Sequence, residues 1–276
     1  RRRDMTALTE AARNAIAAAH VARKEKLLAP LRTQLNRAAA MHFQRQKDLL
    51  DRRLRDKFAH LNEAVLSEGL AEITAMILTD VFKETRGAFT ASMQEAIVRA
   101  MQGAVRHRCA DFNVDIAFNF HDPQVQAALK AYCGKQIAGI DETTRRTVAA
   151  IIGRGKADGL SYSEIARRMV KRFDQFGDPA PQKHIRNRAE LIAVYELGQA
   201  YESAGRQTVN RLSAKGIPME KSWLTVGDDR VSALCRNNQD EGWIPLEQPH
   251  QSGHQQPCGH PACRCCELYQ VAGGDE

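Results

Sequence analysis

The first hundred residues contain almost nothing that ends a helix, and this continuity limits the folds open to the chain. Between residues 4 and 107 the sequence has a single proline, Pro30, and three glycines. Apolar residues recur there at three- and four-residue spacing, as in Leu28, Leu31 and Leu35, which is typical of a helix with one buried face. We therefore predict long helices that bury these stripes against one another in an α-hairpin, or against neighbouring subunits.

Alternation of apolar residues with polar or smaller ones replaces the helical pattern at residues 112–120. A two-residue period is typical of a β-strand. We take this strand as the start of a second region, 111–215, which follows a basic helical arm at 1–110. The remainder of the second region is predicted to be helical.

Local signals place the helices of this second region. Two helices are expected between residues 123 and 154, with Asp141 as the N-cap of the second. Ser161 and Glu164 form a capping box for a further helix. A last helix is expected over residues 186–212, beyond a loop that contains glycine and proline.

The third region, 216–276, combines many loop-forming residues with many cysteines. Five of the seven cysteines lie within the 32 residues from 235 to 266, and four of the nine prolines lie between positions 245 and 261. Only a short strand, at 223–225, is expected there. A segment with so little regular structure needs a local cross-link to stay folded.

Zinc supplies such a cross-link, because it binds about four thiolate or imidazole ligands and adds its binding energy to folding. The candidate ligands are Cys235, Cys258, His260, Cys263 and Cys265. Reduced thiols held only by packing, or a disulfide formed outside the cell, are alternatives that the sequence leaves open. The overall prediction is a mainly α fold with long N-terminal helices, a mostly helical domain, and a small, loop-rich, zinc-stapled α+β C-terminal module.

Positive charge is concentrated near the N-terminus. Residues 1–60 contain 15 Lys and Arg against 6 Asp and Glu, a net charge of +9, whereas the whole chain carries +7. Such a segment favours a polyanion, either nucleic acid or an acidic protein surface, with an affinity that falls as salt rises. The alternative is a solvated helical face without a partner.

Neither export nor membrane insertion is expected. No stretch approaches the roughly 18 apolar residues of a membrane span, and no apolar core of a signal peptide follows the first arginines. The cysteines are therefore expected to be reduced.

Enzymatic signatures are missing from the sequence. It contains no P-loop, no GxSxG motif and no HExxH helix. Asp228 and Asp229 are a candidate carboxylate pair, but beside Gly227 they are more typical of a turn. The segment GLSYSEIARRMVKRF, at 159–173, is similar to the first helix of a helix-turn-helix motif, although the loop after it is long for that motif. We expect a protein that is not an enzyme.

Two motifs, WLTVGDDRVSALC at 223–235 and GHPACRC at 259–265, resemble the signature of the phage Mu F-like minor head proteins, a phage head morphogenesis family. The order of the preceding elements is also similar, so the likeness extends over residues 112–266. Two positions depart from the family. Val-Tyr-Glu at 194–196 stands where Arg-Thr-Glu is frequent, and Ser232 occupies the first cysteine of the CxxC members.

The resemblance implies a minor structural protein of a tailed-phage capsid, located inside the head near the portal in several copies. It implies assistance in head assembly and a role in DNA packaging or delivery. The implied partners are the portal protein, the capsid interior and packaged double-stranded DNA, with no membrane. The chain would pass through the host cytoplasm during assembly.

Two other functions remain open from the sequence. One is a free DNA-binding regulator that combines the segment at 159–173 with a zinc ribbon. The other is a metal-dependent hydrolase that uses Asp228 or Asp229.

Overall fold

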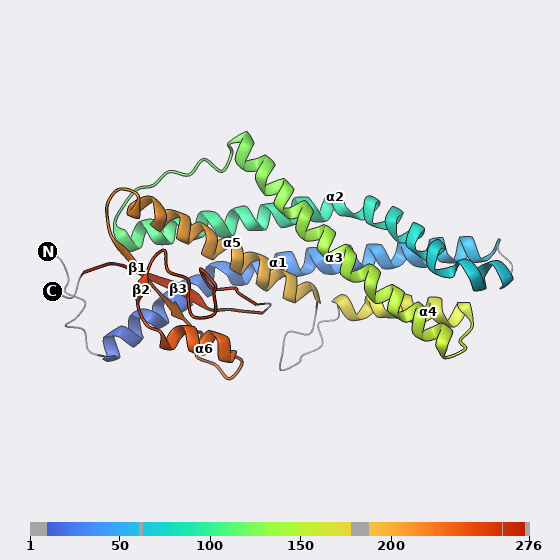
Figure 1. Cartoon of the computed structure of the whole chain (residues 1–276). Coiled ribbons are helices and arrows are strands. Elements are labelled where there is room, and N and C mark those ends of the chain that lie inside the picture. Colours follow the sequence, from blue (N-terminus) through green and yellow to red (C-terminus); the bar gives the residue numbers. More distant parts are fainter. Residues whose placement is uncertain (1–9, 61–62, 178–187, 261, 274–276) are drawn as a thin grey trace. The chain divides into compact units, whose positions relative to one another are not determined.

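A computed structural model describes residues 10–60, 63–177, 188–260 and 262–273 (Figure 1). The elements in this part of the chain are α1 (Glu10–Phe58), α2 (Glu63–Phe112), α3 (Pro123–Ala157), α4 (Tyr162–Gly177), α5 (Arg188–Ser213), β1 (Met219–Leu224), α6 (Ala233–Asp240), β2 (Ile244–Pro245) and β3 (Cys266–Val271). The predicted mainly α fold with a small α+β module at the C-terminal end is confirmed. Among the described helices, none is both long enough and apolar enough to span a membrane.

The chain folds into two compact units, each assembled from segments that are distant in sequence. Unit 1 contains residues 1–34, 96–120 and 191–276, and unit 2 contains residues 35–95 and 121–190. Both long N-terminal helices therefore contribute to both units.

The three regions expected from the sequence, 1–110, 111–215 and 216–276, follow the order of elements along the chain. The compact units instead combine pieces of different regions, and only the third region lies within a single unit. The division of the chain into these three regions stays a prediction.

Helices α1 and α2 form the predicted α-hairpin. In unit 2, Arg53 on α1 donates to Glu84 on α2 over 2.8 Å. In unit 1, Arg99 on α2 donates to Gln34 on α1 over 3.2 Å, so the two helices run antiparallel. Helix α1 continues through Pro30, which removes a single backbone hydrogen bond in a long helix whose apolar stripe is buried on both sides of the proline.

Helix α3 corrects the predicted break at Asp141. The segment is one helix of 35 residues, and Asp141 lies inside it with 1 % of its surface exposed. Its carboxylate accepts hydrogen bonds from Gln46 Nε2 at 3.0 Å and Arg86 Nε at 2.6 Å. The expected N-cap was wrong because this carboxylate is satisfied by side chains of α1 and α2 within unit 2, and not by backbone N–H groups.

The capping box at the start of α4 is confirmed. The Ser161 N–H donates to Glu164 Oε2 over 2.9 Å, and the Glu164 N–H donates to Ser161 Oγ over 3.4 Å. Two of the N–H groups at the helix start are thereby satisfied reciprocally.

The strand predicted at 112–120 was wrong. Helix α2 continues to Phe112, and residues 114–119 are extended but do not belong to the three-stranded sheet. The alternation reflects a different contact: Phe118 lies under the guanidinium of Arg211 at 3.7 Å, and Arg211 also donates to Ala117 O over 3.3 Å. Half-buried and exposed positions alternate along this segment, because it rests against helix α5 without pairing as a strand.

The small sheet holds the C-terminal part of unit 1 together. Strand β1 is central and pairs antiparallel with β2 and β3. Trp223 lies opposite Glu267, and Leu224 lies opposite Cys266. This register brings the beginning of β3 next to the end of β1, from which the chain continues toward α6.

Histidine burial in unit 2 makes stability depend on pH. His42 stacks on Phe89 with ring centroids 4.6 Å apart, and burial lowers the pKa of His42 from 6.5 to about 4. Because the unfolded chain binds the proton first, the contribution of His42 is complete above pH 6.5 and falls as the pH drops from 6.5 toward 4, by roughly 3 kcal/mol in all.

Urea unfolding at a series of pH values tests this effect. We expect His42→Gln to show a smaller loss of unfolding free energy between neutral and acidic pH than the unaltered protein. The exposed His60 provides the control, because His60→Gln should leave the pH profile unchanged. An unaltered profile in His42→Gln would contradict the assignment.

Candidate functional site

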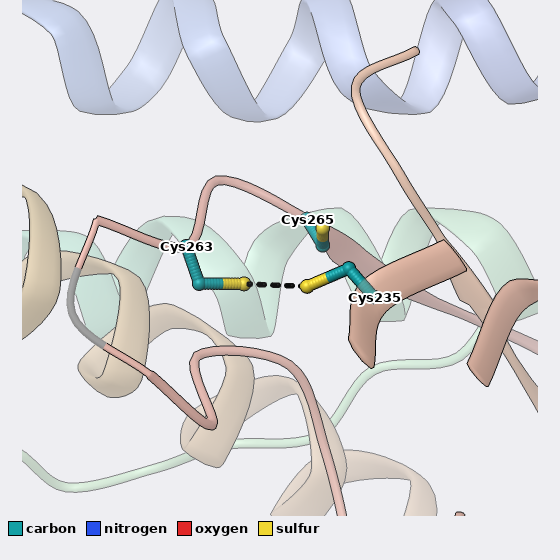
Figure 2. A group of neighbouring side chains, drawn as sticks. All are labelled: Cys235, Cys263 and Cys265. Atoms are coloured by element: carbon teal, nitrogen blue, oxygen red, sulfur yellow. Dashed lines mark hydrogen bonds between the residues drawn. The ribbon is translucent and has the colours of Figure 1, made fainter. Parts of the chain in front are cut away.

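Three cysteines meet in the loop-rich part of unit 1. Cys235 lies in the first turn of α6, Cys263 lies in the loop that follows β2, and Cys265 directly precedes β3. Their Sγ atoms all lie within 4.8 Å of one another, and all three side chains are buried. Figure 2 shows the sulfurs of Cys235 and Cys263 directed at each other.

The sulfur spacing suits a metal ion. Cys235 Sγ and Cys263 Sγ are 3.8 Å apart. A tetrahedral site with metal–sulfur bonds of about 2.3 Å holds its sulfurs about 3.8 Å apart. The three described thiols can therefore hold a metal ion with little movement, whereas a disulfide would require the two sulfurs to approach to about 2.05 Å.

His260 supplies a nitrogen at the edge of this group. His260 Nε2 lies 3.1 Å from Cys235 Sγ and 3.0 Å from Ser232 Oγ. Ser232 is also the N-cap of α6, because its side chain accepts a hydrogen bond from the Cys235 N–H over 3.2 Å. Ser232 thus contacts both the residue that carries the thiol and the imidazole beside it.

Cys258 is not part of the three-thiol group. It is fully buried against α5, where a Cβ atom added to Gly198 would lie 2.6 Å from Cys258 Sγ. Gln199 Nε2 donates to Cys258 O over 2.6 Å, and the backbone of Cys258 has a positive φ of 72°. Of the five predicted ligands, Cys235, Cys263 and Cys265 form one group, and His260 lies beside it. Cys258 packs against α5, outside this group.

Hydrogen bonds among the thiols shift the pKa values of Cys263 and Cys265 in opposite directions. The thiols of Cys235 and Cys258 hydrogen-bond to Cys263 and lower the pKa of Cys263 far below its ordinary value. Hydrogen bonds with Cys235 and Cys263 raise the pKa of Cys265. A cation among the sulfurs would stabilise the deprotonated forms of all three thiols.

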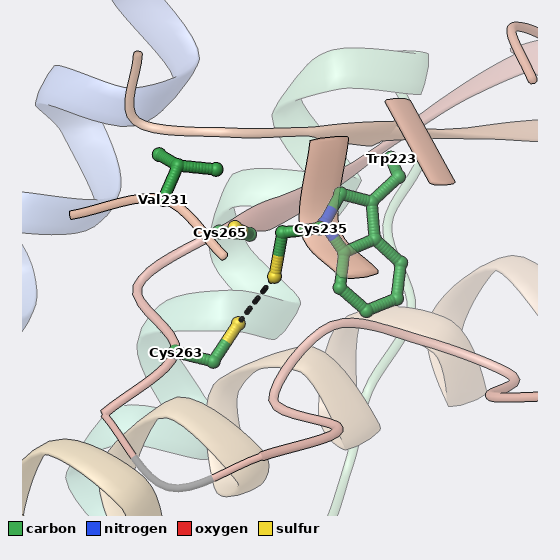
Figure 3. Packing of buried hydrophobic residues seen from close by; sticks show 5 residues of the cluster. All are labelled: Trp223, Val231, Cys235, Cys263 and Cys265. Carbon is green, nitrogen blue, oxygen red and sulfur yellow. Dashed lines mark hydrogen bonds between the residues drawn. The ribbon is translucent and has the colours of Figure 1, made fainter. Parts of the chain in front are cut away.

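The thiol group is enclosed by an apolar cluster. Trp223, Val231, Cys235, Cys263 and Cys265 pack together (Figure 3), and Trp223 is 1 % exposed. Enclosure of this kind excludes water and slows exchange of a bound metal, which is typical of a structural site.

A buried ion pair connects this module to the helices of unit 1. Lys24 on α1 donates to Glu202 Oε1 on α5 over 2.7 Å, and the exposures of the two side chains are 2 % and 0 %. Lys24 also donates to the carbonyl oxygen of Cys265. Burial acts to lower the pKa of Lys24, but the Glu202 carboxylate outweighs it and raises the pKa.

Further buried polar groups hold β3 in place. Arg108 on α2 donates to Glu267 O over 2.7 Å, and the Glu267 N–H donates to Glu202 Oε2 over 3.2 Å. The Glu267 side chain is bonded to His250 Nε2 at 2.7 Å. The side chains of Arg108 on α2 and Glu202 on α5 thus satisfy the C=O and N–H groups of Glu267, the second residue of β3.

Asp228 has a structural role in this module. Its Oδ1 accepts from the Arg230 N–H at 3.2 Å, and its Oδ2 accepts from Arg264 Nη2 at 2.5 Å. The arginines lower the pKa of Asp228. The turn interpretation is therefore confirmed, and this carboxylate connects the loop before α6 to the residue between Cys263 and Cys265.

Lys24 was counted among the charges of a basic surface that would bind a polyanion. The structure corrects this for Lys24, whose ammonium group is buried. The signal was present in the spacing, because Lys24 stands four residues before Leu28 and seven before Leu31, on the apolar face of α1. A charged residue on such a face indicates a buried partner.

Comparison with known proteins identifies a family over part of the chain. Residues 146–268 match the family described as Phage Mu protein F like protein. This range contains all three thiols of the group, and the match confirms the resemblance seen in the sequence. No curated protein and no solved structure matches the chain.

Removal of one member of the buried ion pair tests its contribution to unit 1. We expect Lys24→Met to lower the unfolding free energy by about 3–5 kcal/mol, because it leaves the Glu202 carboxylate buried without its cation. The double variant Lys24→Met with Glu202→Met should lose less than the sum of the single losses.

Urea denaturation measures these differences, with Lys26→Met as the matched control. Lys26 is exposed on the same helix, so its replacement should change stability by less than about 0.5 kcal/mol. Equal stabilities for Lys24→Met and Lys26→Met would contradict the role of the ion pair.

Proposed function

We propose that this chain, whose residues 146–268 match the Phage Mu protein F like family, is a minor structural protein of a tailed-phage head. In this proposal it acts inside the capsid near the portal and assists head assembly. It is present in several copies, passes through the host cytoplasm during assembly, and has no catalytic role. The portal protein, the capsid interior and packaged DNA are its proposed partners.

One observation carries the proposal: the family match, at residues 146–268, includes the three cysteines that the fold brings together in the C-terminal module. The two motifs that identify the family contain Cys235, Cys263 and Cys265, which the fold gathers into one buried group. The surrounding side chains pack around these thiols and leave them buried. A structural component of the phage head is the function that the family match and this enclosed, buried group support best.

The proposed metal is zinc, with Cys235, Cys263 and Cys265 as thiolate ligands and His260 as the fourth. This set of three sulfurs and one imidazole is a common structural zinc site. When bound, the metal would supply folding energy to a module whose sheet has a strand of only two residues. His260 would exchange its contact with Ser232 for the metal.

Metal analysis of the purified full-length protein tests the zinc proposal. We expect about one zinc per chain, and we expect Cys263→Ser to lower both the metal content and the melting temperature. Cys258→Ser should retain its zinc, because Cys258 lies outside the three-thiol group. Cys109→Ser, which alters a half-buried thiol of α2, serves as the control.

Two results would contradict zinc binding at this site. One is purified protein that lacks metal and gains no thermal stability when zinc is added. The other is a Cys263→Ser variant with the zinc content of the Cys109→Ser control.

The virion proposal is tested in the phage or prophage that encodes the chain. An antibody against the full-length protein should detect it in gradient-purified heads, and cross-linking should connect it to the portal protein. Deletion of the gene should reduce the yield of infectious particles. A chain that stays in the particle-free fraction of the lysate would refute the proposal.

A further inference from the structure

Much of the positive charge on α1 is neutralised within the chain. Seven basic residues of this helix form ion pairs with carboxylates in their own unit, among them Arg23 with Asp111 at 2.6 Å. The seven are Arg23, Lys24, Arg32, Arg45, Lys47, Arg53 and Arg55. The excess charge counted along the sequence therefore overstates the charge that α1 presents to a partner.

A second basic segment is exposed at the surface of unit 2. Residues 154–172, from the end of α3 through most of α4, contain six Lys and Arg against two Asp and Glu, a net charge of +4. All six basic side chains are exposed. Of the two carboxylates, Glu164 is used in the capping box of α4, and Asp158 forms an ion pair with Arg168 at 3.5 Å. Two carboxylates cannot neutralise six cations, so the segment stays positively charged.

The packing of α4 fixes the direction of this basic face. Ile165, Met169 and Phe173 are buried, and the exposed basic residues lie to either side of this apolar ridge. Arg172 borders one hollow with Arg154, whereas Arg167 and Lys171 border a second hollow that Asp51 and Asp174 also line. A Cβ atom at Gly155 would lie 2.6 Å from Ile165 Cγ1, which shows how closely α4 approaches the end of α3. The exposed arginines of the two helices are thereby held on one rigid hairpin.

Arginines from both helices line a common hollow. Arg154 of α3 and Arg172 of α4 border a cavity of about 410 Å³ whose other lining residues are Thr147, Ala150 and Ile151. Its lining contains no carboxylate. Two guanidinium groups around a hollow with an apolar floor suit an oxyanion such as a phosphate group.

The electrostatic surroundings of this hollow also favour an anion. Arg188, which is partly buried in the same unit, donates to Thr144 Oγ1 over 2.8 Å. Burial lowers the pKa of Arg188 to about 10, Asp141 opposes this, and the charge of Arg172 lowers the pKa further. Arg188 does not line the hollow, but its charge and that of Arg172 repel each other, so Arg172 stands in a region of positive potential.

The distribution of charge favours a polymer over a single acidic side chain. Arg167 and Lys171 stand one helical turn apart, as do Arg168 and Arg172, with a rise of about 6 Å between the members of each pair. Basic groups repeated along two helices match the regular phosphates of a nucleic-acid backbone, which Arg and Lys contact without reading the sequence.

We propose that the basic face of the α3–α4 hairpin, centred on Arg154, Lys171 and Arg172, binds the phosphate backbone of double-stranded DNA. This inference rests on the proposed function, because packaged DNA is the polyanion inside a phage head. The DNA contact would then lie on α3 and α4 of unit 2, and not on the basic arm at 1–110 that the charge of the sequence favoured.

The test compares two full-length variants with the same loss of charge. The first carries Arg154→Gln, Lys171→Gln and Arg172→Gln. The second carries Lys26→Gln, Arg37→Gln and Arg52→Gln, which remove three exposed charges from α1. Fluorescence anisotropy with a short duplex of random sequence measures affinity over a range of salt concentrations.

We expect the first variant to bind at least about tenfold more weakly than the unaltered protein at moderate salt. Its slope of log affinity against log salt should be shallower by roughly 2.7, since each lost phosphate contact removes about 0.9. The α1 variant should keep both values. If the first variant melts early, the pair Arg154→Gln and Arg172→Gln is compared with the pair Arg37→Gln and Arg52→Gln on α1, and the expected change in slope is roughly 1.8.

Three outcomes would overturn the inference. Unchanged affinity in the α3–α4 variants would remove the DNA contact from this face. An equal loss of DNA affinity in the α1 variant would assign the DNA contact to helix α1. Competition by polyglutamate as effective as that by DNA would assign the face to an acidic protein surface. None of these three outcomes bears on the virion location, which is tested separately by detection of the protein in purified heads.

Discussion

The buried ammonium group of Lys24 is the interaction on which the arrangement of unit 1 depends. A single cation cannot remain in the core without compensation, and Lys24 is compensated by Glu202 of α5 and by the carbonyl oxygen of Cys265. Two helices and the start of β3 must therefore come together for any one of them to be buried favourably. The position of Cys265, and with it the thiol group, follows from this requirement.

Local signals in the sequence predicted the local structure well. The capping box of Ser161 and Glu164 and the turn at Asp228 are satisfied by residues within a few positions of themselves, so they are visible in the sequence. Asp141 and the alternation at 112–120 misled because their partners, Gln46 and Arg211, are far away in the chain. Residue type and spacing predict what a side chain needs, but only the folded chain shows where the partner is.

The candidate site shows the same limit at the level of ligands. Clustering of cysteines and histidines pointed to a cross-link, and three of the five candidates do converge. The backbone conformation at Cys258, with its positive φ, turns that residue toward α5, and no spacing rule predicts this. The sequence also did not predict the role of Ser232. This role depends on the N-cap geometry of α6 and on the position of the His260 ring, which only the fold determines.

The discontinuous construction of unit 1 has a consequence for how the protein is made. Lys24 leaves the ribosome long before Glu202 and Cys265 exist, and its helix must wait for more than half of the chain before its charge can be paired. Contacts between residues so far apart slow folding, and the unpaired amphipathic helices expose apolar surface in the meantime. The nascent chain thus has a long interval in which other proteins can bind these helices, before the last strand closes the unit.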